Sequence, residues 1–280
     1  MFYLPFKLRE ITQLSTPRGP NFQRAKLVSV NLGGNIVTLR LPRHKPVHPG
    51  YDDPIYLKGK IDIYDRGAYV KEMPEIAWGL QAVVQRTWRF NGPMFSGKLA
   101  SLEFSMLLLK RDMPEGESLF NSEIFEREIC GRLTVYYAED KFRWASDWIT
   151  PLNWQLHDQL PVFSASYDVM PRVVGLPKTE FVFPIADNCM VILYFRQMQL
   201  KDGGIEELDQ LIDRSTMAQL CRDIIASTRL ELSAESQQQL HWAQQEYPGV
   251  TLNPQMAPLK WTTPEEDEKH AYYLAHPHEF

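Results

Sequence analysis

The most apolar stretch of the chain, residues 181–199 (FVFPIADNCMVILYFRQMQ), limits the folds that this sequence can adopt. From 189 to 195, odd and even positions are both apolar, which is typical of a central strand covered on each face. Pro184 and the step from Ala186 to Asn188 predict a turn, so residues 181–183 and 189–198 are expected to be two strands. A chain of 280 residues is long enough to cover both faces.

Other segments show the alternation of half-buried strands. Residues 26–42 (KLVSVNLGGNIVTLRLP) predict a β-hairpin with two glycines and Asn35 at its turn. Residues 57–65 and 98–112 each predict a strand, and 132–148 predict a second hairpin with its turn near 138–140. Residues 75–90 fit a helix and a strand equally well, because alanine and glutamine alternate there with β-branched residues and tryptophan.

Helices are predicted mainly toward the C-terminus. The segment 215–232 (STMAQLCRDIIASTRLEL) has an apolar stripe at i, i+3, i+4, i+7 and i+8, formed by Met217, Leu220, Cys221, Ile224 and Ile225. Further helices are predicted over 117–129, from Ser233 to the residues before Pro248, and from Pro264 to Ala275. The predicted class is α+β, an antiparallel sheet built from β-hairpins with packing helices.

The predicted organisation has three parts. Residues 1–150 form a β-rich α+β region, and 151–250 form a strand-strand-helix-helix region packed with it. Residues 251–280 form a polar tail with a short helix. The segment 149–163 (ITPLNWQLHDQLPVF) is predicted to be irregular because prolines interrupt it, and the internal boundary is placed there.

Charge and composition exclude several classes of partner. The formal net charge of −5 argues against binding to a phosphate backbone, so no nucleic acid partner is expected. No apolar run approaches the roughly 20 residues that span a bilayer, and the first residues do not read as a signal peptide. We therefore expect a cytoplasmic protein without a membrane partner. Cys130, Cys189 and Cys221 are predicted to be buried thiols.

Two histidine motifs are candidates for chemistry. HKPVH places His44 and His48 four residues apart, but Pro46 and Pro49 exclude the helix that would aim both at one metal. An exposed polar loop explains this motif, and a catalytic or metal site with two nearby acids is the alternative; those acids are Asp52 and Asp53. His157, followed by Asp158, is interpreted as polar surface or capping. No cofactor or bound metal is predicted.

Two pieces of the sequence resemble a known superfamily. FVFPIADNCMVILYFRQ, followed by CRDIIASTRL on a helix, resembles the ending of Mog1/PsbP-like domains, and GNIVTLRLP resembles their opening. That superfamily includes effector-associated adaptor chaperones of bacterial type VI secretion systems. The resemblance covers about 60 residues and implies a cytoplasmic protein that works by holding another protein. It carries over no functional residue.

The favoured hypothesis is therefore a non-catalytic protein-interaction module, such as an adaptor chaperone or an immunity protein of a bacterial secretion toxin system. Aromatic residues in segments rich in prolines and turns are the candidate binding residues, because aromatics are enriched at interfaces. They are Tyr51, Tyr56, Trp144, Trp148 and Trp154. The acidic balance suits a basic partner. The alternative is a hydrolase, metal-dependent or not, with its site near residues 44–53.

Overall fold

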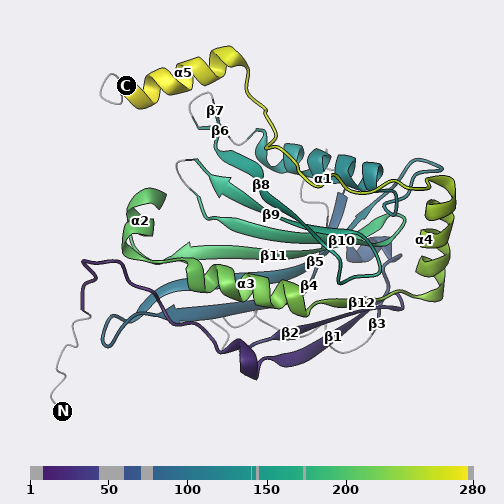
Figure 1. Ribbon diagram of the computed structural model, residues 1–280, viewed down its shortest axis with the longest axis horizontal. Helices are drawn as coiled ribbons and strands as arrows, with labels where there is room; N and C mark the ends of the chain where they lie inside the picture. Colours follow the sequence, from purple (N-terminus) through teal and green to yellow (C-terminus); the bar gives the residue numbers. More distant parts are fainter. Residues whose placement is uncertain are drawn as a thin grey trace.

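A six-stranded antiparallel sheet forms the centre of the protein. The computed structural model describes residues 9–43, 60–70, 78–139, 141–142, 145–172 and 175–276. The strand order is β4-β5-β11-β10-β9-β8 (Figure 1). These strands are β4 (Trp78–Asn91), β5 (Lys98–Arg111), β8 (Trp148–His157), β9 (Ser164–Pro171), β10 (Lys178–Ala186) and β11 (Cys189–Gln199).

The predicted hairpin at 181–199 is confirmed as β10 and β11, which lie inside the sheet. Its turn is shorter than predicted, because β10 continues through Pro184, which pairs with Met190, and ends at Ala186. Phe181 pairs with Leu193, and β11 pairs along its other edge with β5. Along β11, Val191 and Leu193 belong to one hydrophobic core, whereas Ile192 belongs to a second core on the opposite face. All these side chains are fully buried, as expected for a strand that is apolar on both faces.

A small sheet and a helix cover the face of the large sheet on which Val191 and Leu193 lie, which we call the first face. The sheet has the order β12-β2-β1-β3, and the predicted hairpin at 26–42 is confirmed as its β1–β2 pair. These strands are β1 (Lys26–Leu32), β2 (Asn35–Leu41), β3 (Lys60–Ile61) and β12 (Arg229–Glu231). Helix α3 (Ser215–Ser227) lies beside the small sheet and buries all five residues of the predicted stripe. Figure 1 shows α3 in front of the large sheet, between β11 and the small sheet.

Helix α1 (Ser122–Tyr137) covers the second face. Phe125, Ile129 and Leu133 recur every four residues and pack into the second core, together with Val182 and Ile192 of the sheet. The side chain of Asn121 accepts hydrogen bonds from the backbone N–H groups of Glu123 and Ile124, which caps the helix. Part of the tail runs along α1 in Figure 1, and Leu252, Leu259 and Trp261 pack against this core.

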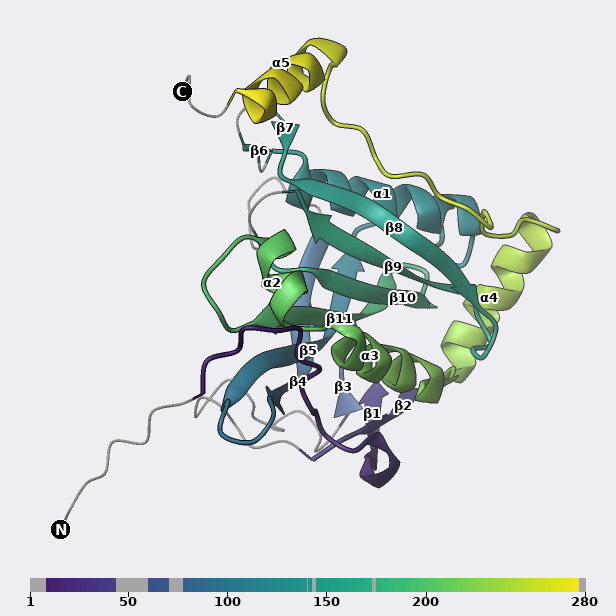
Figure 2. The ribbon, with the colours of Figure 1, turned by 60° about the vertical axis from the view of Figure 1, so that its left-hand side comes forward.

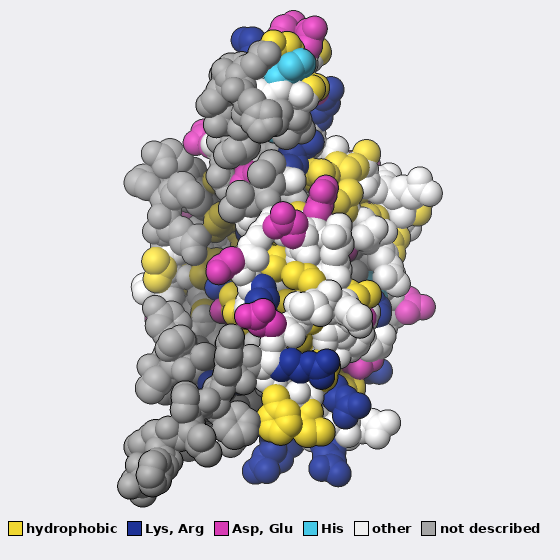
Figure 3. Space-filling view, turned by 90° about the vertical axis from the view of Figure 1, so that its left-hand side faces the viewer, with side chains coloured by type: hydrophobic (Ala, Val, Ile, Leu, Met, Phe, Trp, Pro, Cys, Tyr) yellow, Lys and Arg dark blue, Asp and Glu magenta, His cyan; other side chains and the backbone are white. Residues whose placement is uncertain are grey.

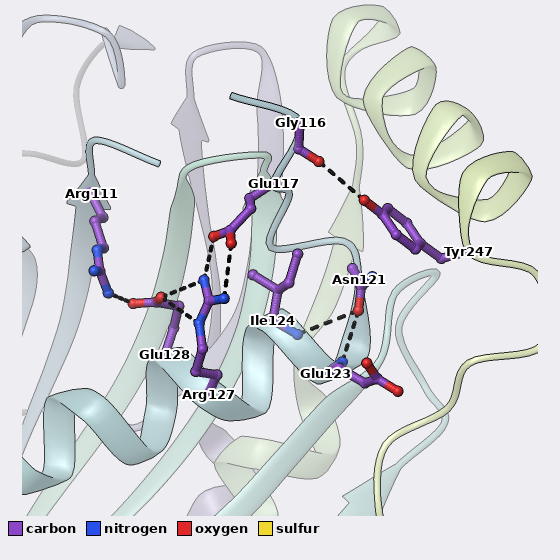
Figure 4. A network of polar contacts seen from close by, with 9 residues as sticks. All are labelled: Arg111, Gly116, Glu117, Asn121, Glu123, Ile124, Arg127, Glu128 and Tyr247. Atoms are coloured by element: carbon purple, nitrogen blue, oxygen red, sulfur yellow. Dashed lines mark hydrogen bonds and ion pairs between the residues drawn. The ribbon is translucent and has the colours of Figure 1, made fainter. Parts of the chain in front are cut away.

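Charged groups are also buried on the α1 side. Glu128 contacts Arg111 and Arg127, and Arg127 also binds Glu117, as Figure 4 shows. The side chain of Glu128 is 1% exposed. One turn later, Arg132 is paired with Glu180 of β10, and neither side chain reaches solvent appreciably. The pairing satisfies charges that would be strongly unfavourable alone in an apolar layer.

The remaining elements are short or peripheral. They are the 3-10 turns η1 (Phe22–Arg24) and η3 (Arg66–Ala68), the strands β6 (Lys141–Phe142) and β7 (Ala145–Ser146), and the helices α2 (Ile205–Leu211), α4 (Ala234–Glu246) and α5 (Pro264–Ala275). The predicted helices from Ser233 and Pro264 are confirmed. In Figures 1 and 2, α5 stands above the sheet, near β6 and β7. No helix within the described ranges is both long and apolar enough to cross a membrane.

Four segment predictions need correction. Of the strand predicted over 57–65, residues 57–59 lie outside the described ranges, β3 covers only 60–61, and 62–65 are not in a strand. The hairpin predicted over 132–148 is wrong in its first part, because α1 continues to Tyr137 and keeps Leu133 in the second core. The helix predicted over 117–129 is thus displaced to 122–137. The segment at 149–163 is not irregular over its first half, which belongs to β8. The ambiguous residues 75–90 contain strand β4. The α+β class is confirmed.

Candidate functional site

Most of the residues that the sequence singled out lie outside the described ranges. They are His44, His48, Tyr51, Asp52, Asp53, Tyr56 and Trp144. The hydrolase site near 44–53 and the binding roles of those aromatics therefore stay predictions. Among the residues whose structure is described, no group of three or more histidines, cysteines, aspartates or glutamates is arranged to hold a metal ion.

Two predicted binding residues are described, and both pack within the fold. The ring of Trp148 is 5.2 Å from that of Tyr137, and the residue is only 8% exposed. Trp154 stacks on Tyr167 at 5.8 Å, and its indole N–H donates to the carbonyl of Asn253 at 2.9 Å. These contacts anchor β8 and the tail, which gives both tryptophans a structural role. Any contact with a partner stays a prediction.

A long groove lies on the first face of the sheet, beside α3. Its volume is about 1000 Å³, at the upper end of the size typical of ligand sites. Its floor comes from β8, β9, β10 and β11, and its walls come from α3 and from residues at and after the end of α2. In Figures 1 and 2, α3 lies beside β11, and β9 and β8 follow on the side of the sheet away from it.

Alternation along β9 makes the floor polar. Tyr167 and Val169 point into the second core beneath α1, so Ser166, Asp168 and Met170 point to the opposite face and line the groove. The adjacent strand β8 contributes three polar side chains at the same two-residue spacing; these are Asn153, Gln155 and His157. Where the small sheet and α3 cover this face it is apolar, and where they end it becomes hydrophilic.

Asp168 is held at the centre of the floor by two neighbours. One carboxylate oxygen accepts from the Thr179 hydroxyl at 2.6 Å, and the other accepts from the Asn153 amide at 2.8 Å. Asn153 adopts a left-handed backbone conformation with φ of 52°, which asparagine tolerates better than most residues. These contacts fix the direction of the carboxylate while it lines the groove.

His157 and Ser166 form a second fixed pair. The His157 Nε2 atom lies 2.8 Å from the Ser166 hydroxyl oxygen, and the imidazole packs edge-on against Phe181. Burial lowers the pKa of His157 from its ordinary value, so the ring is neutral at neutral pH. A neutral imidazole beside a hydroxyl can orient a ligand or accept a proton from the serine.

The walls carry both signs of charge. Arg214 binds both carboxylate oxygens of Asp209, at 2.7 and 2.6 Å. Asp213 accepts from the backbone and side chain of Ser215, and these bonds, together with one from Thr16, lower the pKa of its carboxyl. Cys221 also lines the groove, but burial raises the pKa of its thiol, so the reactive thiolate is disfavoured.

Sequence reasoning missed this groove for an identifiable reason. The segment SASYDVM at 164–170 alternates small or polar residues with larger apolar ones, which is the signal of a strand between a core and an open face. The prolines of the preceding segment, 149–163, mask this signal, because they predict irregular structure where β8 pairs with β9. His157 was assigned to polar surface or capping, whereas the structure places it half-buried against Ser166.

Comparisons with known proteins do not identify the chain. No protein-family model, curated protein or solved structure matches it. The resemblance to Mog1/PsbP-like domains therefore stays a prediction.

Proposed function

We propose that this protein is a cytoplasmic interaction module that holds an extended segment of another protein in the groove beside α3. The observation that carries the proposal is the length of the groove. Its lining follows α3 from Ser215 to Ala226, which at the rise of an α-helix is about 16 Å. An extended chain advances about 3.3 Å per residue, so the groove suits about five residues of a partner.

The lining suits a polar peptide. Amides, hydroxyls and charges of both signs face the groove, and such groups can pair with the backbone and side chains of an extended segment. The side chains at its centre are already oriented by their own hydrogen bonds, so binding would order few of them. An adaptor chaperone or an immunity protein of a bacterial secretion toxin system would work in this way, and the net charge of −5 favours a basic partner.

The proposal is tested by filling the groove from α3. Ala218 lines it, whereas Gln219, the next residue, is exposed on the same helix and does not. Ala218→Arg should project a long side chain into the groove, and Gln219→Arg is the matched control. Arginine is a good helix former, so both variants should fold. The tagged proteins are purified gently from the native cell, and co-purifying proteins are identified by mass spectrometry.

We expect one stoichiometric partner with the wild type and with Gln219→Arg, and its loss with Ala218→Arg. Cross-linking from position 218 should then map to one short segment of that partner. Equal recovery with all three proteins would overturn the groove as the docking site. Absence of any partner under gentle and stringent conditions alike would count against the module itself.

The contact between His157 and Ser166 favours a second function, hydrolysis by acyl transfer. The Ser166 oxygen would attack a carbonyl carbon while its proton passes to His157 Nε2, and His157 would then protonate the leaving group. Water would release the acyl group from the serine. Ser166 is 8% exposed, but it lines the groove. A fluorophosphonate probe should label the wild type and fail to label Ser166→Ala; no labelling of the wild type would eliminate this function.

A further inference from the structure

The carboxylate of Asp168 lies in the floor of the groove with no cation paired to it among the described residues. It is half-buried on β9, and it takes part in none of the ion pairs between described side chains. Its two hydrogen-bond donors, Thr179 and Asn153, are neutral. A charge that is partly withdrawn from water is usually paired with an opposite charge, so this position favours a positively charged ligand.

The basic residues that line the described groove are engaged elsewhere. Arg214 donates to both carboxylate oxygens of Asp209, at 2.7 and 2.6 Å. The Lys178 amine lies under α1, on the opposite face of the sheet, where it contacts aromatic side chains of the second core. Arg222 is exposed on α3 and donates to Gln219 at 2.8 Å. A cation for the floor would therefore come from a bound partner.

The negative charge of the floor acts across the groove and is reinforced at one end. Burial, and after it the Asp168 charge, raises the pKa of the Cys221 thiol on the α3 wall. Helix α2, whose end borders the groove, carries exposed Glu206 and Glu207 in its first turn. Figure 3 faces the end of the molecule with α2 and shows acidic side chains over its middle and Lys and Arg toward its lower edge. Such a field attracts a cationic side chain.

The free acceptors of the floor suit an arginine better than a lysine. An ionised carboxylate has about four acceptor positions, and the structure uses one on each oxygen of Asp168. The position left on each oxygen matches the two parallel N–H groups of a guanidinium. The side-chain oxygens of Asn153 and Gln155 also line the groove and accept no hydrogen bond from a described residue. A guanidinium has more donors than an ammonium group and holds them in a planar fork.

We propose that Asp168 anchors an arginine side chain of the segment that the groove binds. This inference rests on the proposed function, because the arginine belongs to the extended segment held beside α3. The guanidinium would donate two parallel hydrogen bonds to the Asp168 carboxylate and further bonds to the amide oxygens of β8. The net charge of the chain favours a basic partner in general, whereas this anchor requires an arginine at one position of the partner.

The first test uses the full chain and short peptides. The probes are capped peptides of sequence Gly-Ala-X-Ala-Gly, in which X is arginine, lysine or citrulline, and binding is followed by the NMR shifts of the β9 and α3 amides. Citrulline has the shape of arginine without its charge. We expect the arginine peptide to bind about tenfold more tightly than the citrulline peptide, with the lysine peptide between them. Equal binding of arginine and citrulline peptides, or no shift at millimolar arginine peptide, would overturn the anchor.

A charge-neutral variant locates the preference in the floor. Asp168→Asn removes the charge, and its amide oxygen can still accept from Thr179, so the variant should fold with a thermal midpoint close to that of the wild type. It should bind the arginine and citrulline peptides equally. Asp158→Asn is the matched control, because Asp158 is exposed and does not line the groove; it should keep the preference for arginine. An Asp168→Asn protein that keeps this preference would overturn the anchor.

Co-purification separates failure of the anchor from failure of the proposed function. We expect Asp168→Asn to lose the partner, and the partner segment that cross-links from position 218 to contain an arginine. Loss of the partner with Ala218→Arg but not with Asp168→Asn would overturn the anchor and leave the groove as the docking site. Equal recovery with Ala218→Arg and the wild type would overturn the groove, and the anchor with it.

Discussion

Tyr167 and Asp168 are neighbours in β9, yet they point to faces of the sheet that treat polar groups in opposite ways. Under α1, the Tyr167 hydroxyl donates to Glu180 at 2.7 Å and accepts from Arg132 at 2.9 Å, and burial raises the pKa of Tyr167 well above its ordinary value. On the other face, Asp168 is equally well hydrogen-bonded but borders an open groove. Polar groups on the α1 side thus hold the layers in register, whereas those on the groove side remain available to a ligand.

The largest effect should come from breaking the buried ion pair between Arg132 and Glu180 under α1. Glu180→Ala leaves Arg132 charged in a layer that water does not reach, so we expect the free energy of unfolding to fall by about 3–5 kcal/mol. Urea denaturation measures the change. Replacing both residues, as in Arg132→Met with Glu180→Leu, should recover most of it. A loss below about 1 kcal/mol for Glu180→Ala would contradict the burial of both charges away from water.

A smaller effect is expected for the network in Figure 4. Glu128 is buried like Glu180, but its partners Arg111 and Arg127 are 29% and 52% exposed and can turn to water when it is removed. We expect Glu128→Ala to lower the free energy of unfolding by about 1–3 kcal/mol. Glu117→Ala, which removes only the outer partner of Arg127, should change it by less than about 1 kcal/mol. A larger loss for Glu117→Ala than for Glu128→Ala would show that the outer ion pair, between Arg127 and Glu117, is the one that stabilises α1.

A substitution on the groove side should affect partner binding much more than the free energy of unfolding. Asp168→Ala removes two hydrogen bonds at the border of an open space, so the unfolding free energy should fall by only about 1 kcal/mol. Recovery of the co-purifying partner should nevertheless fall sharply. The control is Asp158→Ala, an exposed aspartate at the end of β8 that does not line the groove. Equal recovery with the two variants would mean that Asp168 makes no contact with the partner.

The smallest effect concerns pH. Burial lowers the pKa of His157 below its ordinary value of 6.5, so the unfolded chain binds this proton more readily than the folded protein does. The stability contributed by neutral His157 is therefore present above about pH 6.5 and is lost as the pH falls through the lowered value. Urea midpoints at neutral and mildly acidic pH should differ less for His157→Gln than for the wild type. His241→Gln, on an exposed face of α4, should leave the difference unchanged.

Elements governed by local patterns could be predicted from the sequence. The β10–β11 hairpin follows from a two-sided apolar run and the turn at Asp187 and Asn188, and α3 follows from one regular stripe. Each signal lies within about 20 residues of the chain. Packing against the rest of the fold does not change the type of either element.

Strands β8 and β9 show where such reasoning fails. Pro151 and Pro161 predict an interruption of regular structure, yet Pro151 lies within β8. The strand accommodates it through irregular pairing with β9 around Pro151 and around Asn153. Because the groove depends on β8 lying beside β9, and on α3 stopping short of both, no single segment encodes it. Likewise, Arg132 meets Glu180 only after the sheet has formed, 48 positions away in the chain.

The alternation along β11 has a consequence for how the molecule opens. Leu193 belongs to one core and Ile192 to the other. If either α1 or the small sheet with α3 separated from the large sheet, water would therefore reach side chains of β11. We expect the backbone amides of β10 and β11 to exchange with deuterium only through global unfolding, as one cooperative unit. Amides on the tip of the β4–β5 hairpin should exchange through small local fluctuations that leave this unit intact.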